Sequence, residues 1–185
     1  MLVLASASPR RQEILRAAEI SFEVHPADIL EDPLPGENAK DCAERLAREK
    51  AESISRKHPH NPVLGADTVV VIDNQILNKP VDSADAIRML RLLSGRTHQV
   101  ITGVCLVVNG QTSVASETTS VQMSEITEKE IAAYVATGEP MDKAGAYAIQ
   151  GIASRWIPRI EGDYSNVVGL PIALVYRMLR EAGVI

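Results

Sequence analysis

The Asn109-Gly110 pair lies between two long strand-like stretches and restricts the fold more than any other feature of the chain. Residues 99–108 run apolar towards their end, and residues 112–123 are rich in Thr and Ser. Asn-Gly is the preferred two-residue turn of a β-hairpin, because both positions accept positive φ angles. The two stretches are therefore predicted to pair as antiparallel strands, which is incompatible with a purely parallel sheet.

Strand-like and helix-like segments alternate along the rest of the chain. Apolar or β-branched runs predict strands at residues 2–5, 63–72 and 155–160. Apolar spacing, capping signals or an initial proline predict helices that start at Pro9, after Thr127 and at Pro171, and helices that cover 37–56 and 83–93. The Pro-rich residues 25–36 are predicted to form a loop. This order predicts an α/β fold in one domain, residues 1–185, with a mixed sheet flanked by helices.

The composition is that of a globular protein with an acidic balance. Of the 185 residues, 45% are hydrophobic and 23% are charged, with a net charge of −5. A chain of this length buries an adequate core without disulfides, and an acidic chain is unsuited to coating nucleic acid. No apolar stretch approaches the ~20 residues of a membrane span, and the N-terminus lacks the pattern of a signal peptide. We therefore expect a cytoplasmic protein in which Cys42 and Cys105 are reduced and buried.

The first strand-to-helix turn has the features of an anion site. Ser6 and Ser8 are small and polar, and Arg10 and Arg11 follow in the first helical turn. Free backbone N–H groups and the positive end of the helix dipole favour a phosphate at such a turn. Arginines oppose that dipole, and an anion in front of them would remove the conflict. An ordinary solvated helix start is the alternative interpretation.

Asp67 is the most informative charged residue, because it interrupts the apolar run of the strand predicted at 63–72. Leaving a carboxylate buried and unpaired is costly, so such a group pairs with a cation, binds a metal or acts as a base. A structural ion pair is the alternative, with Lys79, held extended by the proline after it, as the candidate partner. Lys50 lies on the apolar face of its predicted helix, where it either meets an anion or extends to solvent.

Seven charged residues lie outside any evident surface pattern: Arg10, Arg11, Lys50, Lys79, Glu37, Asp67 and Asp142. Together they predict a cation-lined anion site that includes a divalent metal ion, with Glu37 and Asp67 as its expected ligands. Their spacing leaves open whether the side chains converge. The four histidines lack the spacing of a metal site. The sequence also has no phosphate-binding loop, dinucleotide fingerprint or serine-nucleophile motif, so kinase, dehydrogenase and serine hydrolase functions lose their support.

Five groups of residues together resemble the Maf family over essentially the whole chain. They are Leu4-Ala5-Ser6-Ala7-Ser8-Pro9-Arg10-Arg11, Gly65-Ala66-Asp67-Thr68-Val69-Val70, Asn78-Lys79-Pro80, Leu93-Ser94-Gly95-Arg96-Thr97-His98-Gln99-Val100, and Asp142-Lys143-Ala144-Gly145 with Ile149-Gln150-Gly151. The resemblance implies an ITPase-like α/β fold with two lobes around a cleft. It also implies hydrolysis of nucleoside triphosphates to monophosphate and pyrophosphate with a divalent metal cation, Mg²⁺ or Mn²⁺.

The last of these groups is similar to the branch of the family that acts on dTTP and UTP and removes non-standard or excess nucleotides. The resemblance places the general base at Asp67, base specificity at Arg10, Thr68 and Gln150, and phosphate contacts at Arg11, Lys50 and Lys79. The turn argument adds Ser6 and Ser8 as phosphate-binding residues. Lys79 and Arg11 are expected to stabilise the charge that develops on the leaving pyrophosphate.

Two other functions remain open on the sequence. One is a pyrophosphatase for purine or modified nucleotides on the same fold, because a fold does not define the base. The other is a nucleotide-binding regulator of septum formation without catalysis, although Asp67 and its cations favour an enzyme. The expected partner is a nucleoside triphosphate substrate, and self-association to a homodimer is a further expectation. Neither nucleic acid nor a membrane is an expected partner.

Overall fold

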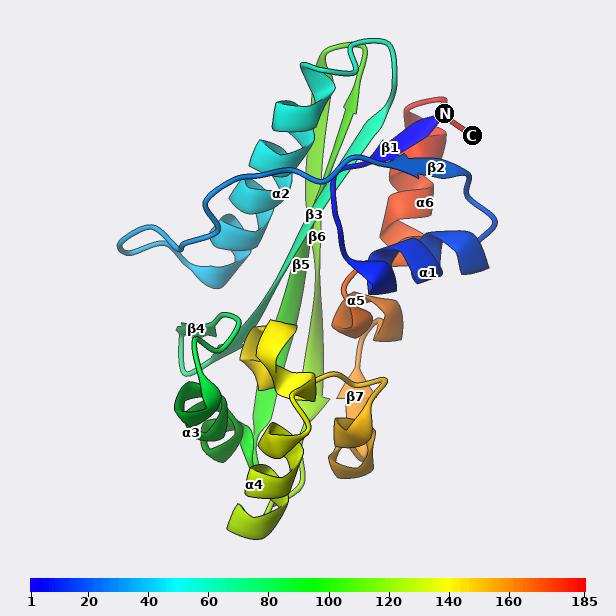
Figure 1. Cartoon of the computed structure of the whole chain (residues 1–185). Helices are drawn as coiled ribbons and strands as arrows, with labels where there is room; N and C mark the ends of the chain where they lie inside the picture. The colour runs from blue at the N-terminus through cyan, green and yellow to red at the C-terminus, as the bar shows by residue number, and fades with distance from the viewer.

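Seven strands form one mixed sheet in the computed structural model, which describes residues 1–185 (Figure 1). The strand order is β2-β1-β3-β5-β6-β7, and β4 pairs with β3 outside this path. The strands are β1 (Leu2–Leu4), β2 (Phe22–Val24), β3 (Val63–Ile72), β4 (Gln75–Leu77), β5 (Thr97–Val108), β6 (Gln111–Gln122) and β7 (Arg159–Glu161). β1 runs parallel to β2 and β3, and the other pairings are antiparallel.

Helices flank this sheet, as the alternation of segments predicts, so the α/β class with a mixed sheet is confirmed. The α-helices are α1 (Pro9–Ala17), α2 (Ala39–Ser55), α3 (Ser83–Leu93), α4 (Glu128–Ala136), α5 (Tyr164–Val168) and α6 (Ile172–Glu181). Short 3₁₀ segments cover Glu139–Asp142, Ala144–Ala146 and Ile152–Trp156. The predicted caps are present, because Ser8 caps α1 and Thr127 forms a capping box with Glu130 at α4.

The predicted hairpin is confirmed. Asn109 and Gly110 have φ angles of 50° and 78°, and the antiparallel register extends from the pair Val108–Gln111 to the pair Thr97–Gln122. The apolar end of β5 is explained by burial on both faces, because its alternate residues face opposite sides of the sheet. Cys105 packs with residues of α2, whereas Val104 packs with residues of α6.

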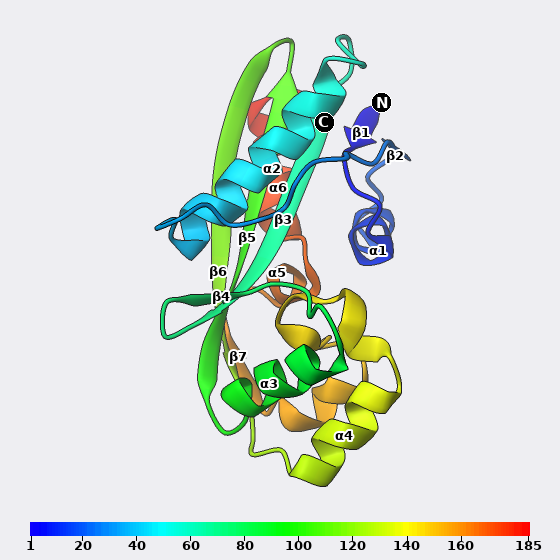
Figure 2. The same cartoon turned by 60° about the vertical axis from the view of Figure 1, so that its left-hand side comes forward.

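The long strands β3, β5 and β6 extend through two lobes, which Figure 2 shows one above the other. The upper lobe carries β1, β2, α1, α2 and α6, and the lower lobe carries α3, α4, β7 and the 3₁₀ segments. Each lobe has its own apolar core. The lower core contains Leu90, Tyr134 and Trp156, and the core beneath α6 contains Leu64 and Leu174.

Two glycines let helix α2 lie close to the sheet. A Cβ at Gly65 would collide with the backbone of Ala47, and a Cβ at Gly103 would collide with the backbone of Ala43. Any larger residue would therefore push the helix away from β3 and β5. This close approach brings Lys50 of α2 within reach of Asp67 of β3.

The structure corrects the sequence prediction at three elements. Strand β2 and the short helix α5 were not predicted, since segments of three and five residues are too short for a periodic pattern. The strand predicted at 155–160 is wrong in its first part, because Ile152–Trp156 is 3₁₀ and β7 begins at Arg159. The Trp156 ring packs edge-on against Tyr134, at 5.3 Å between centroids, which favours core packing over pairing in the sheet.

Cys42 and Cys105 are free and buried, as predicted. None of the helices combines the length and the apolar character needed to cross a membrane.

Candidate active site

A cleft of about 550 Å³ lies where the two lobes meet. One side, which we call the sheet wall, consists of residues 5–11, Lys50 and the 67–70 part of β3. The other side, the turn wall, consists of residues 142–150 in the 3₁₀ region. The loop residue Glu31 and the residue Lys79 after β4 also line the cleft. The structure thus brings together most of the charged residues singled out in the sequence.

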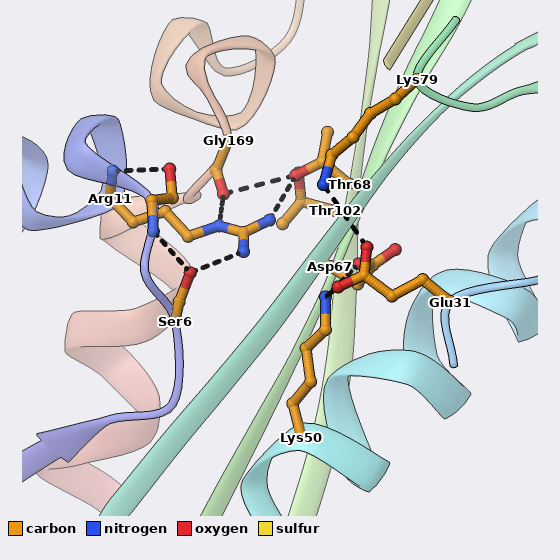
Figure 3. Close-up of polar contacts among 10 residues, drawn as sticks. Ser6, Arg11, Glu31, Lys50, Asp67, Thr68, Lys79, Thr102 and Gly169 are labelled. Carbon is orange, nitrogen blue, oxygen red and sulfur yellow. Dashed lines mark hydrogen bonds and ion pairs between the residues drawn. The ribbon is translucent and has the colours of Figure 1, made fainter. Parts of the chain in front are cut away.

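Lys50 is the centre of a buried charge cluster on the sheet wall (Figure 3). Its Nζ lies 2.7 Å from Asp67 Oδ1 and 2.7 Å from Glu31 Oε1. The Lys50 and Asp67 side chains are only 7% and 10% exposed, so this pair is poorly screened by solvent, whereas Glu31 is 42% exposed. Lys50 therefore meets anions, and the alternative that it extends to solvent is wrong.

The cation paired with Asp67 is Lys50 and not Lys79, the candidate that the sequence offered. Lys79 Nζ lies 3.6 Å from Glu31 Oε2, and its side chain is 61% exposed. Burial alone would raise the pKa of Glu31, but the hydrogen bond from Lys50 and the charges of Lys50 and Lys79 hold that pKa below its usual range. Glu31 thus stays ionised and links the two lysines across the cleft.

Arg11 is a buried cation that joins three parts of the sheet wall. Its Nε donates to the Gly169 carbonyl at 2.8 Å, and its two terminal nitrogens donate to Ser6 Oγ and Thr68 Oγ1 at 3.1 Å each. Burial lowers the pKa of Arg11, and the charges of Asp67 and Glu31 oppose that effect. No carboxylate is within ion-pair distance of the guanidinium, so its positive charge is left for an anion in the cleft.

Ser6 and Ser8 organise the turn before α1. Ser6 Oγ accepts from the backbone N–H of Ser8, and Ser8 Oγ accepts from the backbone N–H of Arg11. Both residues line the cleft. The positive end of α1 therefore faces the cleft, although both hydroxyls already serve the turn itself.

Arg10 and Asp142 connect the two walls. Arg10 Nη1 lies 3.7 Å from Asp142 Oδ2, and the Asp142 side chain is 70% exposed. Asp142 also pairs with its neighbour Lys143, at 2.6 Å. An exposed pair of this length contributes little to stability, so the cleft opening is weakly held at this point.

Glu37, predicted as a metal ligand beside Asp67, does not line the cleft. Both of its carboxylate oxygens accept hydrogen bonds from Arg45, at 2.7 and 2.8 Å. These bonds lower the pKa of Glu37 to about 2. The acid that faces Asp67 is instead Glu31, which the sequence analysis did not single out because a Pro-rich loop has no periodicity to reveal its direction.

The residues expected to read the base differ in how they are held. Thr68 Oγ1 is tied to Arg11 and lies 2.9 Å from Thr102 Oγ1. Gln150 is exposed in the cleft, and its side-chain amide forms no hydrogen bond within the protein. Neither Thr68 nor Arg10 locks the orientation of that amide.

The backbone around Gln150 is held by side chains that the sequence analysis missed. Glu139 Oε1 accepts from the Tyr134 hydroxyl at 2.9 Å and from the Ile152 N–H at 3.1 Å. The Tyr134 hydroxyl also accepts from the Ala148 N–H at 3.4 Å. Gly151 has no room for a Cβ, which would collide with the Glu139 carboxylate.

A second tie joins the turn wall to β5. His98 Nε2 lies 2.7 Å from the Tyr147 hydroxyl, and both side chains are buried. Burial lowers the pKa of His98 to about 4 and raises the pKa of Tyr147, so both groups are neutral at pH 7. His98 appeared isolated in the sequence, because its partner lies 49 residues away.

The donor set of the sheet wall suits a hard divalent cation. Asp67 and Glu31 both place one oxygen on the same lysine nitrogen, so the two carboxylates converge at the base of the cleft. No group of three or more His, Cys, Asp or Glu residues is arranged to hold a metal. Mg²⁺ is typically held by one or two carboxylates together with substrate phosphates and water, and this site offers that set.

This α/β sheet has a cleft lined by several cations and a convergent carboxylate pair, and its buried Arg11 has no carboxylate partner; these features define a class of protein built to hold a small polyanion. Residues 1–182 match the model of the family described as Maf-like protein, and the chain belongs to the Maf family. It is 59% identical over 184 residues to the dTTP/UTP pyrophosphatase of Koribacter versatilis, with 100% of this chain and 95% of that protein covered.

Another relative matches the chain over a similar length. The dTTP/UTP pyrophosphatase of Geobacter sulfurreducens is 50% identical over 184 residues, with 98% of this chain and 96% of that protein covered. Among solved structures, the Ham1 protein of Staphylococcus aureus covers 97% of this chain and 98% of its own, at 15% identity and a TM-score of 0.49. That score is too low to classify the fold further.

Proposed function

We propose that this chain hydrolyses nucleoside triphosphates, dTTP and UTP foremost, to nucleoside monophosphate and pyrophosphate. The observation that carries the proposal is the position of Asp67 at the base of the cleft, paired with Lys50, in a cleft that also holds Lys79 and the buried Arg11, which has no carboxylate partner. The names of the relatives from Koribacter versatilis and Geobacter sulfurreducens support the same reaction.

Asp67 would orient the attacking water and take its proton. Its Oδ1 is engaged by Lys50, and its Oδ2 accepts no hydrogen bond from the protein. That free oxygen is the atom to which the proton goes, while Lys50 holds the carboxylate in one orientation. The attack on the α-phosphorus breaks the bond to the pyrophosphate oxygen.

Cations of the cleft would stabilise the charge on the leaving pyrophosphate. A triphosphate carries about four negative charges, and neutralising them in a partly enclosed cleft needs several fixed cations. Lys79 has an exposed side chain that lines the cleft and would meet a phosphate there, whereas Arg11 would act from a buried position with two of its five N–H donors still free. Lys50 would contribute its positive charge from the base of the cleft.

We further propose that the reaction uses a divalent cation, Mg²⁺ or Mn²⁺, which Asp67 and Glu31 would hold. Glu31 replaces Glu37 in this proposal, because Glu37 is paired with Arg45 outside the cleft. Such an ion supplies neutralisation of phosphate charge and a more acidic water. Lys50 would then give up part of its contact with the two carboxylates, since both oxygens it binds face the same space.

Gln150 would read the pyrimidine base from the turn wall. Uracil and thymine present a carbonyl acceptor beside an N3–H donor, and one amide satisfies both. Cytosine presents the reverse pattern, which a rotated amide also matches. Discrimination therefore depends on the backbone that Glu139, Tyr134 and Tyr147 hold, because no side chain fixes the amide itself.

The test is pyrophosphate release from UTP, dTTP, CTP and GTP, compared as kcat/KM with saturating Mg²⁺ or Mn²⁺. We expect UTP and dTTP to be cleaved well and CTP and GTP poorly. A preference for GTP or a methylated guanine nucleotide would reject the pyrimidine assignment and leave the pyrophosphatase standing. Binding of every nucleotide without release of pyrophosphate would reject catalysis and favour a regulatory role.

A further inference from the structure

The two faces of strand β3 carry different parts of the cleft. Neighbouring residues of a strand point to opposite faces of the sheet, so Asp67 and Thr68 project to opposite sides. Asp67 meets Lys50 of α2, whereas the Thr68 hydroxyl lies 2.9 Å from the hydroxyl of Thr102, its cross-strand partner on β5 (Figure 3). Thr68 is therefore on the face of the sheet opposite to the Lys50–Asp67 pair.

The turn wall reaches this same face of β3. Thr68 and Val70 are two residues apart, so their side chains share one face at a spacing of about 7 Å along the strand. Gly145 of the turn wall packs directly on Val70, because a Cβ at Gly145 would lie 2.9 Å from Val70 Cγ1. Val100 and Gln150 line the cleft as well. A base that meets Gln150 is thus placed beside the face of β3 that carries Thr68.

The Thr68 hydroxyl has three neighbours that can share its hydrogen bonds. Arg11 Nη2 donates to Thr68 Oγ1 at 3.1 Å, and a guanidinium nitrogen has no capacity to accept. Thr102 Oγ1 lies at 2.9 Å and can either donate or accept, and the Gly169 carbonyl lies at 3.4 Å. The direction of the Thr68 proton therefore depends on where Thr102 directs its own proton.

Thr102 is committed to the backbone carbonyl of Asn166. Its Oγ1 donates to that oxygen at 3.2 Å, and both residues are completely buried. The carbonyl receives no bond from the next helical turn, because the N–H of Leu170 bonds to the Ser165 carbonyl instead. If Thr102 turned its proton to Thr68, this buried carbonyl would lose its hydrogen bond, which is costly. Thr102 therefore accepts from Thr68.

Asn166 is itself fixed on the sheet by buried hydrogen bonds. Its Nδ2 donates to the Val100 carbonyl at 3.1 Å and to Thr119 Oγ1 at 2.9 Å. Thr119 Oγ1 in turn accepts from the N–H of Asp163, the N-cap of α5, and donates to the carbonyl of the same residue. The acceptor that orders Thr102 is therefore in place before any ligand binds.

The consequence is that Thr68 faces the cleft as an acceptor only. A hydroxyl has one proton and two lone pairs. Thr68 gives its proton to Thr102 and one lone pair to Arg11, so one lone pair is left. Thr68 is partly exposed and lines the cleft, so a ligand meets this lone pair. Uracil and thymine offer it an N3–H donor, whereas cytosine has a lone pair at N3 that would repel it.

We infer that Thr102 is a positioning residue for base selection, which holds the Thr68 hydroxyl as a fixed acceptor for the N3–H of uracil or thymine. The inference rests on the proposed function, and it supplies what the Gln150 amide lacks. That amide rotates to suit either base, because it forms no hydrogen bond within the protein. Thr68 does not reverse its role, because Thr102 is bound to a fixed carbonyl. Cytosine is rejected at N3 even when the amide adapts to its 4-amino group.

The first experiment compares Thr102→Val with Thr102→Ser in kcat/KM for UTP and CTP. Valine retains the shape of threonine without its hydroxyl, so the Thr68 proton is left with the cleft or with the Gly169 carbonyl, which Arg11 already binds. We expect the preference for UTP over CTP to fall about tenfold in Thr102→Val, mainly through KM. Serine keeps the hydroxyl and should retain the wild-type preference. An unchanged preference in Thr102→Val, or an equal loss in both variants, would overturn the inference.

Thr119→Val is the matched control for a general loosening of α5. Thr119 is as buried as Thr102 and also bonds to α5, but it forms no hydrogen bond with Thr68. We expect this variant to lose stability in urea unfolding and to keep the wild-type preference for UTP over CTP. An equal loss of preference in Thr119→Val and Thr102→Val would contradict a specific role for Thr102.

A double variant tests whether Thr102 acts through Thr68. Thr68→Val removes the hydroxyl that Thr102 orders, so adding Thr102→Val to it should not change the preference between UTP and CTP any further. A further loss in the double variant would show that Thr102 acts by another route. The sugar is tested with 3′-deoxy-UTP. If Thr102→Val impairs cleavage of UTP but not of 3′-deoxy-UTP, Thr68 accepts from the sugar hydroxyl and the assignment to N3–H is wrong.

Calorimetry separates this inference from the proposed function. It measures the dissociation constants of the α,β-methylene analogues of UTP and CTP, in which the bond to be broken is replaced by an uncleavable one. If the chain releases no pyrophosphate from any nucleotide, the proposed function fails, yet tighter binding of the UTP analogue that Thr102→Val removes would still support the inference. Equal affinity of the wild type for both analogues would overturn the inference, whether or not the chain is a catalyst.

Discussion

The sheet wall and the turn wall of the cleft differ in how their functional side chains are held. On the sheet wall, Lys50 and Asp67 project from a helix and a strand, are almost fully buried and bind one another directly. On the turn wall, Gln150 is exposed on irregular backbone and binds no protein group. Its position depends on a few ties from Glu139 and Tyr147.

This difference matches the two proposed roles, since the ordered Lys50–Asp67 pair suits the catalytic step and the exposed Gln150 suits recognition of the base. In the proposed reaction, proton transfer to Asp67 would tolerate little misplacement, and the regular elements and ion pair that hold Asp67 would supply the rigidity it needs. The proposed selection of the base by Gln150 would depend on a loop that a small number of side chains position. Substitutions of Lys50 and Asp67 are therefore expected to abolish turnover for every nucleotide, and substitutions of Gln150 to change which nucleotide is preferred.

Asp67→Asn is the strongest test of the sheet wall. Asparagine retains the shape but neither accepts the proton nor binds a metal ion well, so we expect kcat to fall by about 10²–10⁴ for all nucleotides. Nucleotide binding should persist, measured by calorimetry. If the variant retains more than about a tenth of wild-type kcat at saturating metal, Asp67 is not the base.

Replacing each of the two lysines of the cleft by alanine should lower the unfolding free energy by different amounts. Lys50→Ala leaves Asp67 and Glu31 facing each other without their shared cation, and we expect a loss of about 3 kcal/mol in the unfolding free energy of the nucleotide-free protein. Lys79→Ala removes an exposed group and should cost less than about 0.5 kcal/mol. Urea unfolding measures both. Equal losses in the two variants would show that burial does not distinguish them.

The buried contact between His98 and Tyr147 predicts that the stability of the protein depends on pH. Burial lowers the pKa of His98 in the folded protein to about 4, from 6.5, so the unfolded state binds the proton first as pH falls. The stability contributed by neutral His98 is complete above pH 6.5 and lost progressively towards pH 4. By pH 5 we expect wild type to lose about 2 kcal/mol from this group, whereas His98→Asn lacks this component. Denaturant unfolding at pH 7 and pH 5 gives the comparison, and parallel curves for the two proteins would refute it.

Gln150→Glu should have the smallest effect and the most selective one. Its charged form has no amide donor for the base carbonyl, so we expect kcat/KM for UTP to fall about tenfold. The melting temperature should stay within about one degree, because Gln150 is exposed and makes no hydrogen bond. Glu139→Gln is the companion variant. This substitution weakens the support of the loop. We expect it to reduce the difference in kcat/KM between UTP and CTP, while kcat for UTP changes little.

Much of the fold could be predicted from local patterns. The boundaries of β3 agree with the β-branched run at 63–72, and Ser8, Thr127 and the Asn109-Gly110 turn act as their chemistry requires. The capped turn before α1 and the unusual position of Asp67 were also recognisable. These features depend on a few neighbouring residues, so the sequence alone expresses them.

Contacts between distant segments could not be predicted in the same way. Apolar spacing placed Lys50 on a buried face, but the carboxylates it meets come from β3 and from a loop without periodicity. Glu37 and Glu31 look alike in the sequence. Only the folded chain shows that Arg45 engages the first and Lys50 the second.

The sequence by itself determined the α/β class, the hairpin, the helix starts and the residue types that chemistry on a polyanion needs. The tertiary structure decided which charges meet, that Arg11 is committed to three neighbours, and that Gln150 is held through Glu139. The physical reason is the distance along the chain between the groups that interact. Turns and caps are stabilised by groups a few residues apart, whereas an ion pair such as Lys50–Asp67 forms only after packing has brought a helix against a strand through Gly65 and Gly103.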